Sequence, residues 1–147
     1  MLEKKTSYKQ AQLAALIPHQ PPMLLVDTVT DVDEHKLTAT FCCHQQPHPL
    51  APEGHWPNYL LIEFAAQAIA CHGALAGQQS FTRAAIGRIK ALSFYCASLD
   101  DYRELPVSVT VELIEVNGAT CLYRFNAHAR NTVLAQGEAL LIGVPAS

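Results

Sequence analysis

Hydrophobic and polar residues alternate along most of this chain, the period-two pattern of half-buried β-strands. The segments that carry it are 23–33, 36–43, 83–96, 105–116, 120–130 and 132–144. Short turn signals separate some of them, namely Asp33-Glu34-His35, Asn117-Gly118 and Arg130-Asn131, and Asn-Gly is a strong hairpin signal. Because tight turns join antiparallel neighbours, the pattern predicts an antiparallel sheet with one strand for each segment.

Residues 57–77 break the alternation, because they are almost wholly apolar or small. They predict one long helix, apolar on nearly all sides, that ends at Gly77 as its C-cap. A curved sheet wrapped around this helix would cover much of it. The helix surface and sheet edge left uncovered predict a dimer. Ser7 and Gln10 resemble a capping box, which predicts a shorter helix reaching about Leu16.

The elements together predict an α+β fold in a single domain over residues 1–147, a length that allows one real core. Half of the residues are hydrophobic and 16% are charged, as in globular proteins. The net charge of −3 and the pI near 6.1 argue against a nucleic-acid binder.

Location is constrained by three features of the sequence. No apolar run approaches the ~20 residues of a membrane span, and the N-terminal lysines have no apolar region behind them. The five cysteines form no CxxC pair, which fits reduced thiols. We therefore expect a cytoplasmic protein.

Glu63 is the only charged side chain in 57–77, with histidine counted as neutral. An ionised carboxylate is costly in an apolar interior, and such a position suits a group that exchanges a proton near neutral pH. The alternative is a structural acid paired with a nearby Arg or Lys. His72, on the same helix, is expected to be a hydrogen-bonded core or interface residue.

Histidines and cysteines are concentrated before this helix. Neutral imidazole is a suitable general base, so His55 is either a base or a helix cap, and His48 either a base or a solvated loop residue. Cys42, Cys43 and His44 lie close by in sequence and invite a zinc interpretation. However, adjacent strand residues point to opposite faces of a sheet, and we therefore expect no metal.

Three segments resemble, in family order, the hotdog-fold 3-hydroxyacyl-[acyl-carrier-protein] dehydratases. They are IPHQPPMLLVDTV (17–29), GHWPNYLLIEFAAQAIACHGAL (54–75) and RAAIGRIKALSFYCASLDD (83–101). The middle segment resembles the family signature: Gly-His-aromatic-Pro, Pro-Gly, an apolar stretch ending in Glu, then Ala-Gln. The departures from this signature resemble a divergent branch, the dehydratase-like hotdog proteins linked to aryl-polyene-type clusters.

The resemblance implies a hotdog fold, an antiparallel six-stranded sheet wrapped around one long central helix, in a dimer with a tunnel at the subunit interface. The tunnel holds an acyl-phosphopantetheine arm, and no metal or organic cofactor takes part. The implied reaction converts a carrier-protein-bound 3-hydroxyacyl thioester to a trans-2-enoyl thioester in fatty-acid or polyene-type biosynthesis. The family's His takes a proton from C2, and its Glu or Asp, from the partner subunit, protonates the leaving C3 hydroxyl. A backbone amide at the helix start polarises the thioester carbonyl.

Carried onto this chain, Glu63 falls on the family's carboxylate and Gln67 on its Gln, one turn along the same helix face. His55 falls in the Gly-His-aromatic-Pro element but lies only eight residues before Glu63, where the family has a longer segment. His48 lies fifteen residues before Glu63, near the family spacing, but lacks the motif. Either histidine is then the base, or neither is.

Gln67 and two further residues are expected to position substrate. Asn58 stands where the family has Gly after Pro, and because Asn tolerates left-handed dihedrals it could still present the amide. His19, in the Pro-rich segment, is expected to shape the tunnel wall.

Two other functions stay open beside dehydration: a hotdog acyl thioesterase, which needs no histidine base, and a catalytically weak partner subunit in a mixed hotdog dimer. The expected partners are an acyl carrier protein or an acyl-CoA, and a second hotdog subunit, identical or different, in a dimer or larger oligomer. Neither nucleic acid nor a membrane span is expected.

Overall fold

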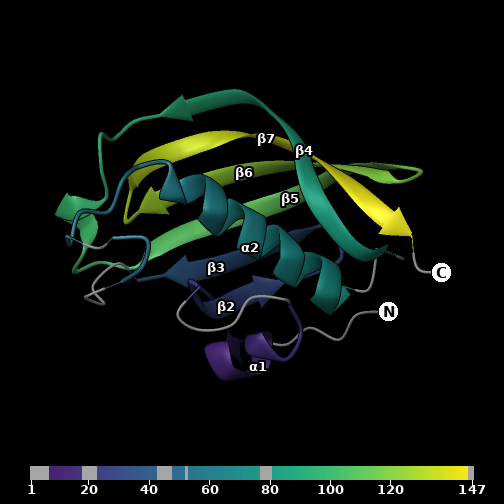
Figure 1. The fold of residues 1–147 in the computed structure, drawn as a ribbon, viewed down its shortest axis with the longest axis horizontal. Coiled ribbons are helices and arrows are strands. Elements are labelled where there is room, and N and C mark those ends of the chain that lie inside the picture. The colour runs from purple at the N-terminus through teal and green to yellow at the C-terminus, as the bar shows by residue number, and fades with distance from the viewer. Residues whose placement is uncertain (1–6, 18–22, 43–47, 52, 77–80, 146–147) are drawn as a thin grey trace.

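One antiparallel sheet of seven strands curves around one long helix, α2, in the computed structural model, which describes residues 7–17, 23–42, 48–51, 53–76 and 81–145 (Figure 1). The strands are β1 (Tyr8–Lys9), β2 (Val26–Val32), β3 (Lys36–Phe41), β4 (Phe81–Phe94), β5 (Val107–Asn117), β6 (Thr120–Ala129) and β7 (Thr132–Pro145). The helices are α1 (Gln10–Ala14), α2 (Leu60–Ala76) and the short 3-10 helix η1 (Asp100–Tyr102). The strand order in the sheet is β1-β2-β3-β5-β6-β7-β4.

The six strands expected from alternation are all present, and the prediction of six is short by one. The missing strand, β1, has two residues, with Tyr8 opposite Val29, which is too short to leave a periodic pattern. The capping box expected at Ser7 and Gln10 is wrong, because α1 begins at Gln10 and it is the Lys9 N–H that donates to Gln12 Oε1, at 2.9 Å. Gly77, the expected C-cap of α2, lies outside the described residues.

The three turns read from the sequence are confirmed, each by local chemistry. In the β2–β3 turn, Asp33 Oδ1 accepts from the amides of His35 and Lys36, both at 2.8 Å, and these bonds hold the pKa of Asp33 below its ordinary value. Gly118 and Arg130 have φ of +62° and +52°, the left-handed conformation that tight hairpins require.

The core lies between the concave face of the sheet and α2, which contacts β2, β3, β5 and β6. Phe64 of α2 stacks on Phe41 of β3 with ring centroids 4.4 Å apart and planes within 5°. Burying a side chain of this size contributes about 1.5–3 kcal/mol, so this pair helps to fix the helix on the sheet.

His72 is a core polar residue, as the sequence predicts. It is fully buried, and its Nδ1 lies 2.7 Å from Tyr123 Oη and its Nε2 3.0 Å from the Asp33 carbonyl oxygen. Burial lowers the pKa of His72, because a charged imidazolium is poorly solvated there.

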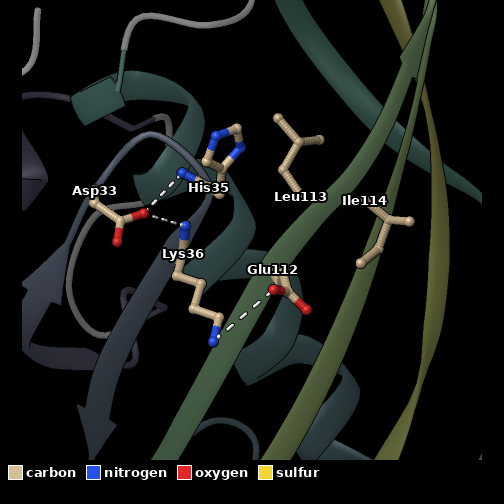
Figure 2. A pocket seen from close by; sticks show the side chains of 6 residues that line it. All are labelled: Asp33, His35, Lys36, Glu112, Leu113 and Ile114. Carbon is tan, nitrogen blue, oxygen red and sulfur yellow. Dashed lines mark hydrogen bonds and ion pairs between the residues drawn. The ribbon is translucent and has the colours of Figure 1, made fainter.

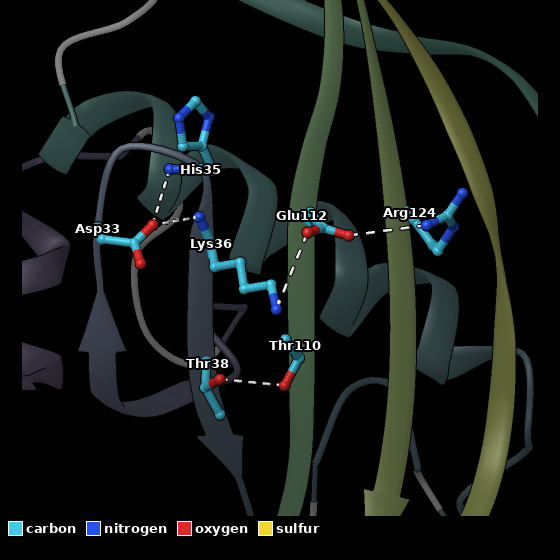
Figure 3. Close-up of polar contacts among 7 residues, drawn as sticks. All are labelled: Asp33, His35, Lys36, Thr38, Thr110, Glu112 and Arg124. Atoms are coloured by element: carbon cyan, nitrogen blue, oxygen red, sulfur yellow. Dashed lines mark hydrogen bonds and ion pairs between the residues drawn. The ribbon is translucent and has the colours of Figure 1, made fainter.

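The outer face of the sheet carries a row of alternating charges (Figure 3). Lys36 Nζ lies 3.8 Å from Glu112, Arg124 lies 3.7 Å from Glu112, and the same Arg124 lies 3.7 Å from Glu138. The row therefore crosses β3, β5, β6 and β7. These pairs are solvent-exposed, so each one contributes little to stability.

One stripe of α2 is not buried by this chain. From position 59 onward, intermediate or exposed residues occur at 59, 62, 63, 66, 70, 73 and 74, a spacing that follows one helical face, and also at 75 and 76 in the last turn. The sheet therefore covers one face of the helix and leaves part of its surface open, as the sequence predicts. Glu63 lies on the uncovered stripe, where a second subunit or a substrate can reach it.

Candidate active site

Glu63 lies in the first turn of α2 and is part-buried, so it is less desolvated than the apolar sequence around it suggests. Its Oε1 accepts a hydrogen bond from Gln67 Nε2 at 3.1 Å. The two side chains therefore share one helix face, as their spacing predicts, and the amide helps to fix the direction of the carboxylate.

Gln67 is fully buried and joins α2 to the chain entering β2. Its Oε1 accepts from the amides of Leu25 at 2.8 Å and Val26 at 3.3 Å, and its Nε2 donates to the Met23 carbonyl oxygen at 2.9 Å. Its side-chain amide thus satisfies backbone groups where the chain enters β2 while it also holds Glu63.

The Gly-His-Trp-Pro segment before α2 is fixed against the chain that follows β4. Pro57 forms an isolated antiparallel bridge with Ser98, and the Leu99 amide donates to the Trp56 carbonyl at 2.7 Å. Trp56 itself is 1% exposed. Its indole Nε1–H is buried without a hydrogen-bond partner in the described part of the chain.

His55 projects from this segment with 64% of its side chain exposed. Its Nδ1 lies 2.6 Å from Asp100 Oδ2, and Asp100 Oδ1 accepts from the Trp56 amide at 2.8 Å. The Trp56 amide, the His55 ring and the nearby Arg103 guanidinium together hold the pKa of Asp100 below its ordinary value. Asp100 is therefore ionised near neutral pH.

His48 is buried, with 3% exposure, so the expectation of a solvated loop residue is wrong. Its ring is tilted by 40° against Trp56 with centroids 5.0 Å apart, and its Nδ1 accepts from the Leu50 amide at 3.1 Å. Because Nδ1 accepts, neutral His48 carries its proton on Nε2. To act as a base through Nδ1 it would have to release the Leu50 amide.

Asn58 connects the start of α2 to the residues after β4, since its Nδ2 donates to the Cys96 carbonyl at 2.9 Å. It is absent from the described residues with positive φ, so the left-handed conformation considered from the sequence is not adopted. His19, Cys43 and His44 lie outside the described residues. Among the residues that are described, no three His, Cys, Asp or Glu side chains gather as metal ligands would.

A hollow of about 530 Å³ lies elsewhere, beside the β2–β3 turn (Figure 2). It is lined by Asp33, His35, Lys36, Glu112, Leu113 and Ile114. None of the candidate catalytic residues lines it, and its wide opening and charged lining differ from the enclosed apolar shape of most ligand sites. We do not assign it to the reaction.

Asp100 is the residue that sequence reasoning missed. It falls in the segment 83–101 that resembles the family, but its contacts lie 44 and 45 residues away at Trp56 and His55. The available signal was the acidic pair Asp100-Asp101, separated by three residues from the end of a predicted strand, which does not reveal the partner.

A single antiparallel sheet wrapped around a central helix is the hotdog fold, and solved structures share it. The dehydratase heterocomplex ApeI:P from Xenorhabdus doucetiae matches with a TM-score of 0.76 and 17% identity, over 89% of this chain and 90% of that one. A thioesterase variant from Pseudomonas aeruginosa matches with a TM-score of 0.69 and 16% identity, over 95% and 96%. A thioesterase from Haemophilus influenzae matches with a TM-score of 0.67 and 16% identity, over 99% and 96%. At these identities the likeness shows the fold.

The family is shown by the sequence itself. A family model described as ApeP-like, ApeP dehydratase, matches residues 11–144, so the chain belongs to the ApeP-like dehydratase family. This confirms the predicted branch of the hotdog dehydratases and the predicted class of reaction, hydroxyacyl dehydration by a lyase. A search of curated protein sequences gives no match. No helix in the described ranges combines the length and apolarity that crossing a membrane requires.

Proposed function

We propose that this protein removes water from a 3-hydroxyacyl thioester on the phosphopantetheine arm of an acyl carrier protein, yielding a trans-2-enoyl thioester. The observation that carries the proposal is the position of Glu63 on the uncovered stripe of α2, with its carboxylate held by Gln67 at 3.1 Å. A carboxyl group in this place can give a proton to a substrate lying along the helix.

In the proposed reaction, His55 Nε2 takes the proton from C2 and Glu63 gives a proton to the C3 hydroxyl. The C–H electron pair forms the C2=C3 double bond, the C3–O bond breaks, and water leaves. The amides of Leu60, Leu61 and Ile62 already donate within the first turn of α2. The amide that polarises the thioester carbonyl is therefore one preceding them. Side chains and backbone suffice, so the proposal includes no metal or organic cofactor.

His55 is preferred to His48 as the base because of the hydrogen bond that each ring makes. In His55 the Nδ1 faces a carboxylate, which accepts hydrogen bonds only, so the lone pair is on Nε2. In His48 the Nδ1 lone pair is occupied by the Leu50 amide. An exposed ring with a lone pair can reach a C2 proton, whereas the ring of His48 must first break a bond.

We further propose that a second hotdog subunit completes the site. The uncovered stripe of α2 and the outer edge of β4, which pairs only with β7 within the described strands, provide the contact surface. One of the similar solved structures is the dehydratase heterocomplex ApeI:P, which supports a mixed pair. Glu63 would then meet a substrate in a tunnel between the subunits.

The test is dehydration of a 3-hydroxyacyl-carrier-protein by the purified protein, alone and mixed with a second hotdog dehydratase subunit. Enoyl absorbance and free thiol are both recorded, and a 3-hydroxyacyl-CoA serves as the alternative substrate. The E63Q variant removes the acid at constant size and should lose about 10²–10⁴-fold in rate. The matched control is E115Q, at an exposed position of β5, which should keep wild-type activity.

Several outcomes would overturn parts of this proposal. Wild-type dehydration by a folded E63Q variant would remove Glu63 from the reaction. Thiol release without enoyl formation would instead indicate a thioesterase. Activity that appears only in the mixture, and is lost when the mixture contains E63Q, would support the mixed site.

A further inference from the structure

We propose that Asp100 is a positioning residue of the active site, which holds His55 in the tautomer with a proton on Nδ1 and a lone pair on Nε2. This inference rests on the proposed function, in which His55 is the base. Asp100 itself touches neither the substrate nor the reacting atoms. Its role is to decide which ring nitrogen of His55 is available and where that nitrogen points.

The two oxygens of Asp100 have different partners. Oδ1 accepts from the Trp56 backbone amide at 2.8 Å, and Oδ2 lies 2.6 Å from His55 Nδ1. The Leu99 amide in turn donates to the Trp56 carbonyl at 2.7 Å, so the backbone that carries the carboxylate is bound to the backbone that carries the imidazole. The orientation of the carboxylate is therefore set by the main chain before it meets the ring.

Charge adds to this geometry. An ionised carboxylate has acceptor atoms only, so the imidazole nitrogen that faces it must donate. The Trp56 amide is the largest cause of the lowered pKa of Asp100, and Arg103, whose Nη2 lies 3.8 Å from Oδ1, contributes in the same direction. The proton of neutral His55 is therefore fixed on Nδ1, opposite to the arrangement in His48, whose Nδ1 accepts from the Leu50 amide.

An exposed His–Asp pair without this framework would be a weak surface contact. Here one carboxylate oxygen is committed to the backbone of the residue that follows His55, which reduces the freedom of the other oxygen. The same division of roles is known from the serine-protease triad, where an Asp fixes the tautomer of the catalytic His without itself becoming protonated.

The D100N variant should change the tautomer of His55 without removing the hydrogen bond to the Trp56 amide. Its side-chain oxygen can still accept from the Trp56 amide, but its NH₂ group then faces His55 Nδ1 as a donor and favours the proton on Nε2. We expect kcat for dehydration to fall about 10²–10⁴-fold with KM near the wild-type value. The matched control is D101N, at the exposed neighbouring position in η1, which should stay within twofold of wild type.

A second readout does not depend on activity. Nitrogen-15 NMR of the histidine rings, with His55 assigned by its loss in H55Q, should show a protonated Nδ1 in the wild type and a protonated Nε2 in D100N. A purely structural role of Asp100 would leave the tautomer unchanged. A wild-type spectrum with the proton on Nε2 would overturn the inference even if D100N failed to fold.

The outcomes distinguish the inference from the proposed function. If the wild type, alone and mixed, shows no dehydration, the proposed function fails. If the wild type is active and H55Q is not, but D100N retains full activity, only the role of Asp100 fails. If H55Q is as active as the wild type, His55 is not the base, and both the base assignment and the role of Asp100 are overturned.

Discussion

Replacing Gln67 by leucine tests how the helix is attached to the sheet. Q67L keeps the size of the side chain but removes the oxygen that accepts from the Leu25 and Val26 amides, at 2.8 and 3.3 Å. A buried donor left without a partner costs about 1–3 kcal/mol, and the longer bond to Val26 belongs at the low end of that range.

The other two bonds of the Gln67 amide count for less. Met23 is 41% exposed and Glu63 is part-buried, so water can replace the lost donor at both. Leucine also gains some apolar burial in place of the amide, which offsets part of the loss. We therefore expect the free energy of unfolding to fall by about 2–3 kcal/mol, equivalent to a drop in Tm of roughly 4–12 °C.

The assay is urea unfolding followed by far-ultraviolet circular dichroism at one fixed protein concentration, because subunit association contributes to apparent stability. The midpoint should fall while the slope with urea stays the same. The matched control is Q136L, since Gln136 is exposed and donates only to Tyr95 Oη, at 3.1 Å, among the contacts described. A Q67L midpoint within about 0.5 kcal/mol of the Q136L value would refute the attachment role.

Three further predictions concern the core. Because burial lowers the pKa of His72, this imidazole binds a proton more readily in the unfolded chain, so stability should fall as the pH drops below about 6.5. In H72F, the urea midpoint should depend less steeply on pH between pH 8 and 5. The same pH dependence in H72F and the wild type would contradict the argument. G137A places a Cβ 2.9 Å from Phe125 Cζ and should lower the free energy of unfolding by about 1–3 kcal/mol. In thermal melts, the double variant G137A/F125L should recover part of the lost Tm. A G137A variant as stable as the wild type would disprove the crowding. Burial raises the pKa of the Cys71 thiol to about 12, so iodoacetamide at pH 8 should label Cys71 only after unfolding. Peptide mass mapping measures the labelling, and rapid labelling of Cys71 in the native protein would contradict the prediction.

The parts of the fold that the sequence predicts correctly are those set by neighbouring residues. Alternation reports which side of a strand is apolar, and it places the strands that later pair as β5, β6 and β7. The Asn117-Gly118 and Arg130-Asn131 turns are local in the same way, and in the structure Gly118 and Arg130 adopt the left-handed conformation of tight turns. The spacing of Glu63 and Gln67 also predicts their contact, because side chains four residues apart meet on a helix.

The parts that could not be predicted depend on which distant segments meet. Periodicity does not reveal that Asp100 lies beside His55, 45 residues earlier, or that Gln67 binds the backbone where the chain enters β2, more than 40 residues away. The burial of His48 against Trp56 was likewise hidden in a Pro- and His-rich segment without periodicity. The two histidines could therefore be ranked as bases only after the hydrogen bond at each Nδ1 was known.

The two edges of the sheet differ in length, and this asymmetry limits how the protein can assemble. At one edge, β4 runs for 14 residues, whereas at the other β1 has two residues and leads directly into α1. A strand added to β4 would leave only the β1 edge of this chain, too short to template another subunit. With the second subunit on β4, as proposed, growth by strand addition ends at that first partner, and the short β1 edge protects the chain against open-ended, fibre-like polymers.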